Sequence, residues 1–356
     1  MRSSASRLAL VALATVAVAA CSQAGAGTSP TSGEPGSSGA AAPVELRLGY
    51  FPNLTHATAL AGIKKGFFEE ALPDNVTLTT VPFNAGPEAV EAIFSGGLDA
   101  SFIGPNPAIN AFAKSNGEAI RIVSGATSGG AYLVVKPGIT SAADLKGKKL
   151  ATPQLGNTQD VALRAWLKEQ GFATDVQGGG DVSILPQANA QTLDTFKSGD
   201  IDGAWVPEPW ATRLVQEGDG KVLVDERDLW PDGQYVTTHL VVTPTFLSAH
   251  PDVVKALLTG VVKANDYVNA DPTEAQEVVN EGIKDVTQKA LPDAVLSAAW
   301  PNLTFTVDPI AASLKTSASE ATELGLLDET DLTGIYDLTL LNEVLREAGQ
   351  PEIAAP

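Results

Sequence analysis

The chain has 356 residues, of which 42 are acidic and 23 are Lys or Arg, so its formal net charge at pH 7 is -19. A strongly acidic surface argues against nucleic acid or an anionic membrane surface as a partner. The single Cys excludes an internal disulfide framework, so the folded part must be held by its core alone.

The first residues have the pattern of an export signal. Arg2 and Arg7 precede an apolar run, Leu8 to Ala20, that is too short to span a bilayer. The run ends in Val18-Ala19-Ala20-Cys21, which matches the bacterial lipobox; the alternative is a plain secretory signal with a chance Cys. We expect residues 1–20 to be a lipoprotein signal peptide and Cys21 to be the lipid anchor, at the outer face of the cytoplasmic membrane. Loss of the two Arg residues would change the net charge from -19 to -21.

Residues 21–43 consist mainly of Ser, Gly, Ala, Thr and Pro. Such a segment has too little apolar bulk to offset its ordering entropy, so we expect a flexible linker. The remainder, about 310 residues, is long enough for two domains. The lipid is the only contact with the membrane that we expect.

Strand and helix patterns alternate from residue 44 onward. The patterns predict strands at 44–50, 76–83, 98–103, 120–124, 131–135, 149–151, 182–185, 202–206, 222–224 and 235–242. Helices are predicted between them at 55–65, 87–94, 107–114, 141–145, 157–170, 190–197 and 209–216. The region from 251 onward is nearly all helical and includes helices at 251–268, 272–283 and 332–348. This alternation predicts an α/β body with open parallel sheets.

The two α/β units are similar in make-up, and the chain returns to the first. We expect one lobe from residues 44–135 and 237–356 and another from 136–236. Two crossing strands, Val134 to Gly138 and Tyr235 to Leu240, are the expected hinge. In open α/β sheets a ligand binds beyond the carboxyl ends of the strands, which here places it in the cleft between the lobes.

Several segments occur in an order that is typical of a known family. They include Gly49-Tyr50-Phe51-Pro52-Asn53, Asp99 to Pro107, Gly156 to Asp160, Val206-Pro207-Glu208-Pro209-Trp210 and His250-Pro251-Asp252. Across residues 45 to 350 the chain resembles the aliphatic-sulfonate, nitrate and taurine substrate-binding proteins of ABC importers. The resemblance implies a type II periplasmic-binding-protein fold, a small organic or inorganic anion as ligand, an ABC-importer permease as partner, and a monomer without a cofactor. An alkylsulfonate or taurine is the expected ligand; nitrate, bicarbonate and a thiamine-type pyrimidine are the alternatives.

Four segments adjoin predicted strands, three of them at the start of a helix. Helix N-termini carry partial positive charge and free N–H donors, so they can bind an anion without Lys or Arg. An acidic surface does not prevent this, because salt screens its field beyond about 10 Å. The candidate ligand-binding residues in these segments are Asn53, Thr55, His56, Asn106, Thr127, Ser128, Asn157, Thr158 and Gln159.

Each segment also has a purely structural interpretation. Asn53 or Thr55 could simply cap a helix, and Asn157 could do the same. The segment 104–107 could be an ordinary turn, and 127–130 a solvated loop. The three His residues are far apart in sequence, so we expect no metal site.

Glu208 and Trp210 follow the strand at 202–206. Trp210 could cover a methylene part of the ligand, or it could pack in the core. Glu208 could accept a hydrogen bond from the amine of a zwitterion such as taurine, because a desolvated carboxylate needs a cationic partner. Its alternative is a structural carboxylate.

Two other classes of protein remain as alternatives. Enzymes that make the pyrimidine precursor of thiamine are similar to this family, but the chain has no Gly-x-Ser-x-Gly, phosphate-loop or His-Glu-x-x-His motif and has an export signal. We therefore expect no enzyme. A surface adhesin or spacer is the other alternative, and it would need no ligand cleft.

Overall fold

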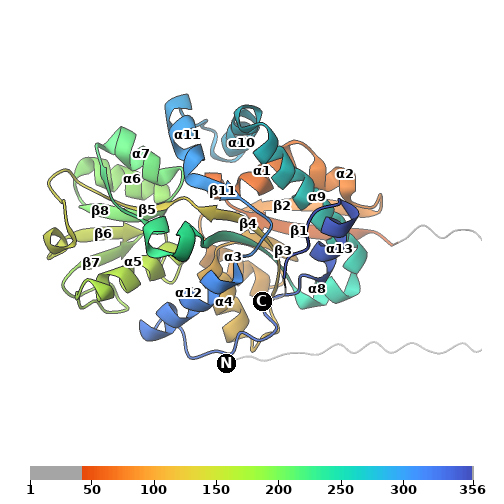
Figure 1. Ribbon diagram of the computed structural model, residues 1–356, viewed down its shortest axis with the longest axis horizontal. Coiled ribbons are helices and arrows are strands. Elements are labelled where there is room, and N and C mark those ends of the chain that lie inside the picture. The colour runs from red at the N-terminus through yellow and green to blue at the C-terminus, as the bar shows by residue number, and fades with distance from the viewer. Residues whose placement is uncertain (1–41, 355–356) are drawn as a thin grey trace, which may run out of the picture. The chain divides into compact units, whose positions relative to one another are not determined.

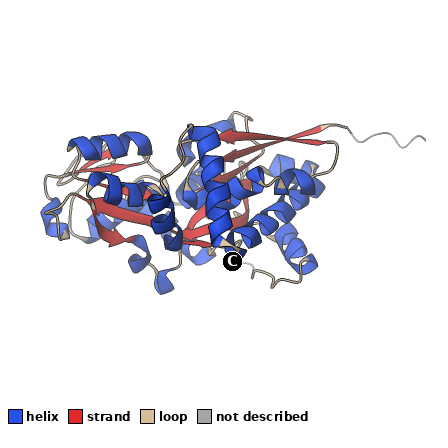
Figure 2. Ribbon diagram, turned by 90° about the horizontal axis from the view of Figure 1, so that it is seen from above, coloured by secondary structure: helices blue, strands red, loops and turns tan. Residues whose placement is uncertain are grey.

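The computed structural model describes residues 42–354 (Figure 1). The predicted signal peptide, Cys21 and most of the predicted linker lie outside these residues. Two sheets organise the described part. Helices flank the strands on both sides (Figure 2).

The first sheet has six strands in the order β11-β4-β10-β3-β1-β2. Strand β1 pairs in parallel with β2 and β3, whereas β10 is antiparallel to β3 and β4, and β11 is antiparallel to β4. The strands are Val44–Tyr50 (β1), Val76–Pro82 (β2), Ala100–Ile103 (β3), Arg121–Gly129 (β4), Val236–Val242 (β10) and Leu303–Phe305 (β11).

The second sheet has five strands in the order β7-β6-β8-β5-β9. Strand β6 is parallel to β7 and β8, and β5 is antiparallel to β8 and β9. The strands are Ala131–Val135 (β5), Lys149–Thr152 (β6), Ser183–Pro186 (β7), Gly203–Pro207 (β8) and Lys221–Asp225 (β9). The predicted α/β class is confirmed. The sheets are mixed and not purely parallel, because β4, β5, β9, β10 and β11 run antiparallel to their neighbours.

Alternating side chains along each strand enter separate cores on the two faces of a sheet. Phe102 lies in one core of the first sheet and its neighbour Ile103 in the other. In the second sheet Leu133 and Val134 are divided in the same way. This period of two is the geometry of a strand that is covered on both faces, and it explains why β3 and β5 are nearly continuous apolar runs.

Helices cover these faces. The elements of the first lobe are η1 (Leu54–His56), α1 (Ala57–Lys64), α2 (Phe67–Ala71), α3 (Gly86–Phe94), α4 (Pro105–Lys114), α8 (Pro244–Ala249), α9 (Pro251–Ala270), α10 (Pro272–Thr287) and α13 (Thr339–Glu347). The second lobe has η2 (Ala142–Leu145), α5 (Thr158–Glu169), α6 (Asn189–Ser198) and α7 (Trp210–Gly218). The last predicted helix, 332–348, is wrong in its first half: helix α13 begins only at Thr339, after a loop that contains Gly334 at φ 82°.

The chain crosses between the sheets at places other than the expected hinge. The first crossing is Gly129-Gly130, where β4 ends and β5 begins, and both residues have left-handed φ values of 77° and 75°. The second crossing contains η3 (Glu226–Leu229) and η4 (Pro231–Gly233) and leads into β10. The expected hinges at 134–138 and 235–240 are therefore corrected, because Val134 pairs with Ala204 inside the second sheet and Leu240 with Phe102 inside the first. We accordingly place the start of the second lobe at about residue 130 rather than 136.

Elements from the C-terminal part touch both lobes. Helix α11 (Asp293–Ala299) packs on α7 and is followed by η5 (Trp300–Asn302), and α12 (Ala311–Glu323) packs on both α4 and α5. The Nζ of Lys168 on α5 lies 2.9 Å from a carboxylate oxygen of Glu323 on α12. These helices connect the lobes beyond the two chain crossings.

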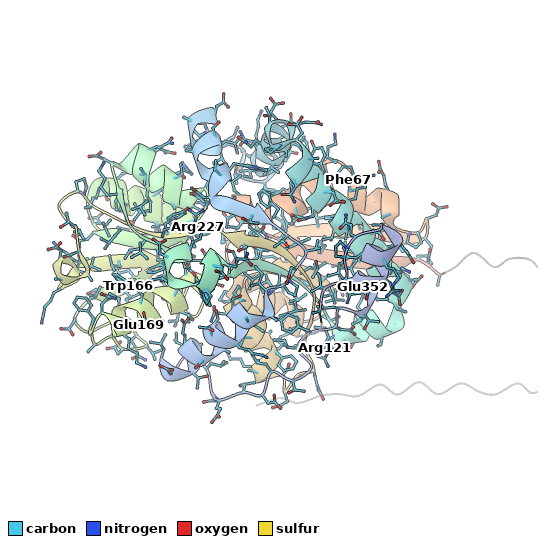
Figure 3. All side chains as sticks on the ribbon, in the orientation of Figure 1. Phe67, Arg121, Trp166, Glu169, Arg227 and Glu352 are labelled. Atoms are coloured by element: carbon cyan, nitrogen blue, oxygen red, sulfur yellow. The ribbon has the colours of Figure 1, made fainter. Side chains whose placement is uncertain are left out.

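A cavity of about 100 Å³ lies where α5, η3 and α12 meet, and three carboxyl groups, those of Glu169, Glu226 and Glu320, line it. Trp166 and Glu169 mark the α5 side in Figure 3. Burial raises the pKa of Glu226 to about 8 and that of Glu320 to about 7, and neighbouring carboxylates add to both shifts. These two groups hold protons for part of the time at neutral pH, so this contact carries less negative charge than its composition suggests.

None of the helices within residues 42–354 combines the length and the apolar character that crossing a membrane requires.

A buried ion pair fixes the start of α5. The carboxylate of Asp160 accepts hydrogen bonds from the Thr152 hydroxyl (2.8 Å), the Gly156 N–H (2.9 Å) and the Nε of Arg164 (2.9 Å). The Asp160 side chain is 0 % exposed and that of Arg164 is 2 % exposed. The pair joins the end of β6, the loop after it and the first turns of the helix.

We expect Asp160→Asn to lower the free energy of unfolding by about 3–5 kcal/mol, because it leaves the Arg164 guanidinium buried without its anion. Urea denaturation of both proteins measures this. Lys168→Met breaks the exposed pair with Glu323 and should cost only about 0–1 kcal/mol. Similar losses in the two variants would show that burial of the Asp160–Arg164 pair does not increase its contribution to the free energy of unfolding.

Candidate functional site

A polar cleft lies where the carboxyl ends of strands from both sheets meet the beginnings of helices. Its lining comes from the turns after β1, β2 and β3 in the first lobe, from the turns after β6, β7 and β8 in the second, and from β10. The lining residues are Phe51, Asn53, Thr55, His56, Asn84, Ala85, Gly86, Gly104, Pro153, Asn157, Thr158, Gln159, Asn189, Pro207 and Thr237. The free space between them is about 20 Å³.

Hydrogen-bond donors without formal charge dominate this lining. No Lys, Arg, Asp or Glu occurs among the lining residues from the described part of the chain. Helices α3, α5 and α6 begin at the cleft with Gly86, Thr158 and Asn189. Their first N–H groups have no carbonyl partner one turn earlier and carry the positive end of the helix dipole. The arrangement suits a small anion held by dipoles.

Helix α5 contributes three expected residues, Asn157, Thr158 and Gln159. The Asn157 side-chain oxygen accepts a hydrogen bond from the Gln159 N–H at 2.8 Å, so the expected alternative of a helix cap also holds. Asn157 thus both caps the helix and lines the cleft. The Thr158 N–H is then the free backbone donor of this helix end.

His56 is a neutral donor in the first lobe. It is 2 % exposed, and its Nδ1 accepts a hydrogen bond from the Phe51 N–H at 3.3 Å. Burial lowers the pKa of His56 to about 3, so the ring is uncharged at neutral pH. With Nδ1 as acceptor, the proton of the neutral ring is on Nε2, and that N–H is available to a ligand.

Asn53 connects the two lobes at the edge of the cleft. Its side-chain oxygen accepts a hydrogen bond from the Trp210 indole N–H at 2.9 Å, and it makes no capping hydrogen bond to η1. Trp210 itself does not line the cleft; the Arg213 guanidinium lies over its ring at 4.7 Å. The expectation that Trp210 covers part of the ligand is therefore corrected: Trp210 holds Asn53.

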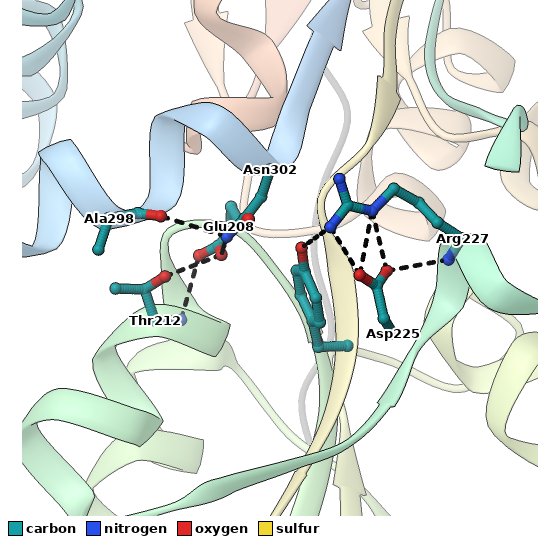
Figure 4. A network of polar contacts seen from close by, with 7 residues as sticks. Glu208, Thr212, Asp225, Arg227, Ala298 and Asn302 are labelled. Atoms are coloured by element: carbon teal, nitrogen blue, oxygen red, sulfur yellow. Dashed lines mark hydrogen bonds and ion pairs between the residues drawn. The ribbon is translucent and has the colours of Figure 1, made fainter.

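Glu208 does not face the cleft. It is 1 % exposed, and its carboxylate accepts hydrogen bonds from the Thr212 hydroxyl (2.8 Å), the Thr212 N–H (3.1 Å) and the Asn302 side-chain amide (2.8 Å), as Figure 4 shows. Burial raises the pKa of Glu208, and the bonds from Asn302 and Thr212 oppose the shift. The expected contact with a ligand amine is thus wrong, because both oxygens bind protein groups. Glu208 joins the start of α7 to η5.

Three other expected residues also lie away from the lining. The Asn106 amide donates to the Ser317 carbonyl at 3.2 Å and ties α4 to α12. The Thr127 hydroxyl donates to the Thr55 carbonyl at 2.7 Å. Ser128 is buried in β4, opposite Val236. The segment 127–130 is a strand end and not the solvated or anion-binding loop that we expected.

Sequence reasoning missed Asn84, Asn189 and Thr237. Asn84 follows β2, and Asn189 follows β7 as the first residue of α6. Both occupy the strand-to-helix position that identified Asn157, so the same rule applied to every turn would have found them. Thr237 lies within β10, where no local pattern distinguishes it from its buried neighbours.

The two lobes touch directly at Gly104. A Cβ atom at this residue would overlap the hydroxyl oxygen of Thr158 on the opposite lobe. Gly104 precedes α4, and Thr158 is the first residue of α5. The absence of a side chain at Gly104 thus lets the two helix ends approach each other across the cleft.

We expect Gly104→Ala to hold the lobes apart, which should increase the radius of gyration and weaken ligand binding at least about tenfold. Small-angle scattering and calorimetric titration measure the two effects. The double variant Gly104→Ala/Thr158→Ser keeps the overlap, whereas Gly104→Ala/Thr158→Ala removes the blocking oxygen and should return the compact form. An unchanged radius in Gly104→Ala would disprove the steric argument.

The buried neutral His56 makes the fold sensitive to acid. Its folded pKa of about 3 lies below the ordinary 6.5, so the unfolded chain takes up a proton that the folded chain does not as the pH falls through this window. We expect His56→Gln to reduce the loss of unfolding free energy between about pH 7 and pH 5 by ~2 kcal/mol. Denaturant titrations at both pH values measure this, and equal losses in the two proteins would contradict it.

Comparisons of the sequence with known proteins show a family and several relatives. Residues 39–281 match the model of the NMT1-like family. The taurine-binding periplasmic protein of Escherichia coli is 30 % identical over 53 % of this chain and 57 % of its own length. The bicarbonate-binding protein CmpA of Synechococcus elongatus is 25 % identical over 65 % of this chain and 55 % of its own.

The fold is shared with a solved structure. The alkanesulfonate-binding protein SsuA from Xanthomonas axonopodis pv. citri, bound to MOPS, superposes with a TM-score of 0.70 at 21 % identity, over 84 % of this chain and 99 % of that one. The expected two-lobed fold and the resemblance to anion-binding proteins of importers are confirmed. The chain belongs to the NMT1-like family.

Proposed function

We propose that the protein is the extracytoplasmic solute receptor of an ABC importer, and that it captures a small anion in the cleft between its lobes and delivers it to the permease. The observation that carries the proposal is the cleft itself, where three helix N-termini and neutral donors from both lobes converge. A ligand held from both sides favours the closed form, which a permease can distinguish from the open one.

The relatives support the same role. They include proteins named for binding taurine and bicarbonate, and a fold relative named for alkanesulfonate. An alkylsulfonate or taurine is accordingly a ligand to test, beside nitrate and bicarbonate. The cleft is better suited to binding than to catalysis. The described lining has no Cys, Lys or carboxylate, and burial lowers the pKa of His56 to about 3, which makes its ring a weak base.

The predicted lipid on Cys21 completes the proposal. A random-coil linker of about twenty residues, which the composition predicts, would span about 25 Å and keep the receptor near its permease. Incorporation of a labelled fatty acid into the expressed protein, lost in Cys21→Ser, tests this part independently of ligand binding.

A thermal-shift screen of oxyanions tests the receptor function. A ligand at one hundred times its Kd should add about 2.7 kcal/mol to the free energy of unfolding. Asn157→Ala should weaken the response, and Asn110→Ala, on α4 away from the cleft, should not. A flat response to every anion would contradict the proposal and favour a spacer or adhesin.

The salt dependence of binding tests how the anion is held. Because the described lining carries no basic residue, affinity should not fall as the salt concentration rises. A site built on Lys or Arg would lose affinity steeply under the same titration. Such a loss would show that a cation outside the described lining holds the anion.

A further inference from the structure

Two polar side-chain atoms at the cleft have no hydrogen-bond partner within residues 42–354: the hydroxyl oxygen of Thr158 and the side-chain oxygen of Asn189. Thr158 is 6 % exposed and Asn189 is 8 % exposed. Both residues line the cleft, at the first positions of α5 and α6. Buried polar atoms without partners are rare in folded proteins, and at a binding cleft they indicate groups that a ligand satisfies.

The two atoms have different requirements. A hydroxyl can donate or accept, so Thr158 can bind any oxyanion. In the orientation that the structure shows, the buried unpartnered atom of the Asn189 carboxamide is its oxygen, which accepts a hydrogen bond only from a ligand that carries a hydrogen. His56, with its free Nε2–H, adds a donor from the opposite lobe. The cleft therefore offers several donors to oxygen atoms and one acceptor to a hydrogen.

The size of the cleft restricts the ligand further. The free space of about 20 Å³ exceeds only slightly the ~10–15 Å³ that one water molecule needs. The contact of Gly104 with Thr158 and the bond from Trp210 to Asn53 close it on two sides. Any ligand larger than water must therefore widen the cleft, and a compact ion of a few heavy atoms requires less widening than an ion with an alkyl chain. A ligand amine would also find no carboxylate among the described lining residues, and the oxygens of Glu208 bind Thr212 and Asn302.

We infer that the cleft selects a compact oxyanion that keeps one hydrogen on oxygen at neutral pH, such as hydrogencarbonate, and that Asn189 is the residue that recognises this hydrogen. The inference rests on the proposed function and narrows its ligand class. The O–H of the ligand donates to the Asn189 oxygen, while the other ligand oxygens accept from Thr158, His56 and the N–H groups at the helix ends.

Hydrogencarbonate and nitrate form a matched pair for the test. Both are planar anions with a single charge and the same number of heavy atoms, and only hydrogencarbonate has an O–H. In calorimetric titrations of the full chain in mildly alkaline buffer, hydrogencarbonate should bind at least about tenfold more tightly than nitrate, because nitrate leaves the Asn189 oxygen unpaired. Ethanesulfonate and taurine, which carry an alkyl chain, should bind more weakly still.

Asn189→Leu, which has nearly the same shape, tests the assigned residue. It should weaken hydrogencarbonate at least about tenfold and nitrate less than about threefold, so that the preference disappears. Asn110→Leu, at a half-buried position of α4 that faces residues 325–330 and not the cleft, is the matched control and should change neither affinity. The comparison of the two anions on the unaltered protein needs no variant, so it stands even if Asn189→Leu folds poorly.

The outcomes separate this inference from the proposed function. Equal or tighter binding of nitrate, or equal losses for both anions in Asn189→Leu, would overturn the role of Asn189 while the receptor function stands. Preferred binding of ethanesulfonate or taurine would overturn the size argument alone. If no oxyanion binds to the unaltered protein, the proposed function falls together with the inference.

Discussion

An anion that leaves water must recover its hydrogen bonds from the protein, and most of the site's design follows from that requirement. A cation could meet it, but the described lining carries none. The α/β architecture offers another solution, because every parallel strand that leads into a helix ends near free N–H groups with partial positive charge. Two such sheets facing each other place six strand ends around one cleft. The lobes thus both position the cleft and supply the N–H groups that donate hydrogen bonds to the anion.

Other buried polar side chains hold these helix ends in place. Asp160 and Arg164 anchor the loop before α5, and Glu208 anchors the start of α7 and joins it to η5. Asn106 joins α4 to α12. Each of these residues is polar, buried and close to the cleft, and each forms hydrogen bonds with the protein. Support of the helix ends, and not ligand contact, explains why polar groups are buried so densely here.

The sequence predicted the fold class and most elements because apolar runs, Gly stops and turn residues are local signals. It predicted Asn53, Thr55, His56 and the segment 157–159 at the cleft for one reason: a residue between a parallel strand and its helix must lie at the carboxyl edge of the sheet. The same reasoning failed for Asn106, which lies in the first turn of α4 but donates to Ser317 on α12. Thr127 and Ser128 precede no helix, because β4 continues to Gly129 before it crosses to the other sheet. For Glu208 and Trp210 the position was right, but the direction of a side chain depends on partners such as Asn302 and Asn53, which are distant in sequence.

The net charge of -19 affects the rate at which the anion associates with this uncharged site more than the rate at which it dissociates. The anion must approach through a repulsive field that reaches about 10 Å into the solvent at moderate salt, and no basic residue of the described lining attracts it. The association rate should therefore lie below that of an electrostatically steered receptor. It should rise when salt screens the field, whereas the association rate of oppositely charged partners falls. Once inside, the anion is held by short-range hydrogen bonds whose dissociation rate is nearly independent of ionic strength. Such a receptor captures its ligand slowly at low salt but does not lose affinity as the salinity around the cell rises.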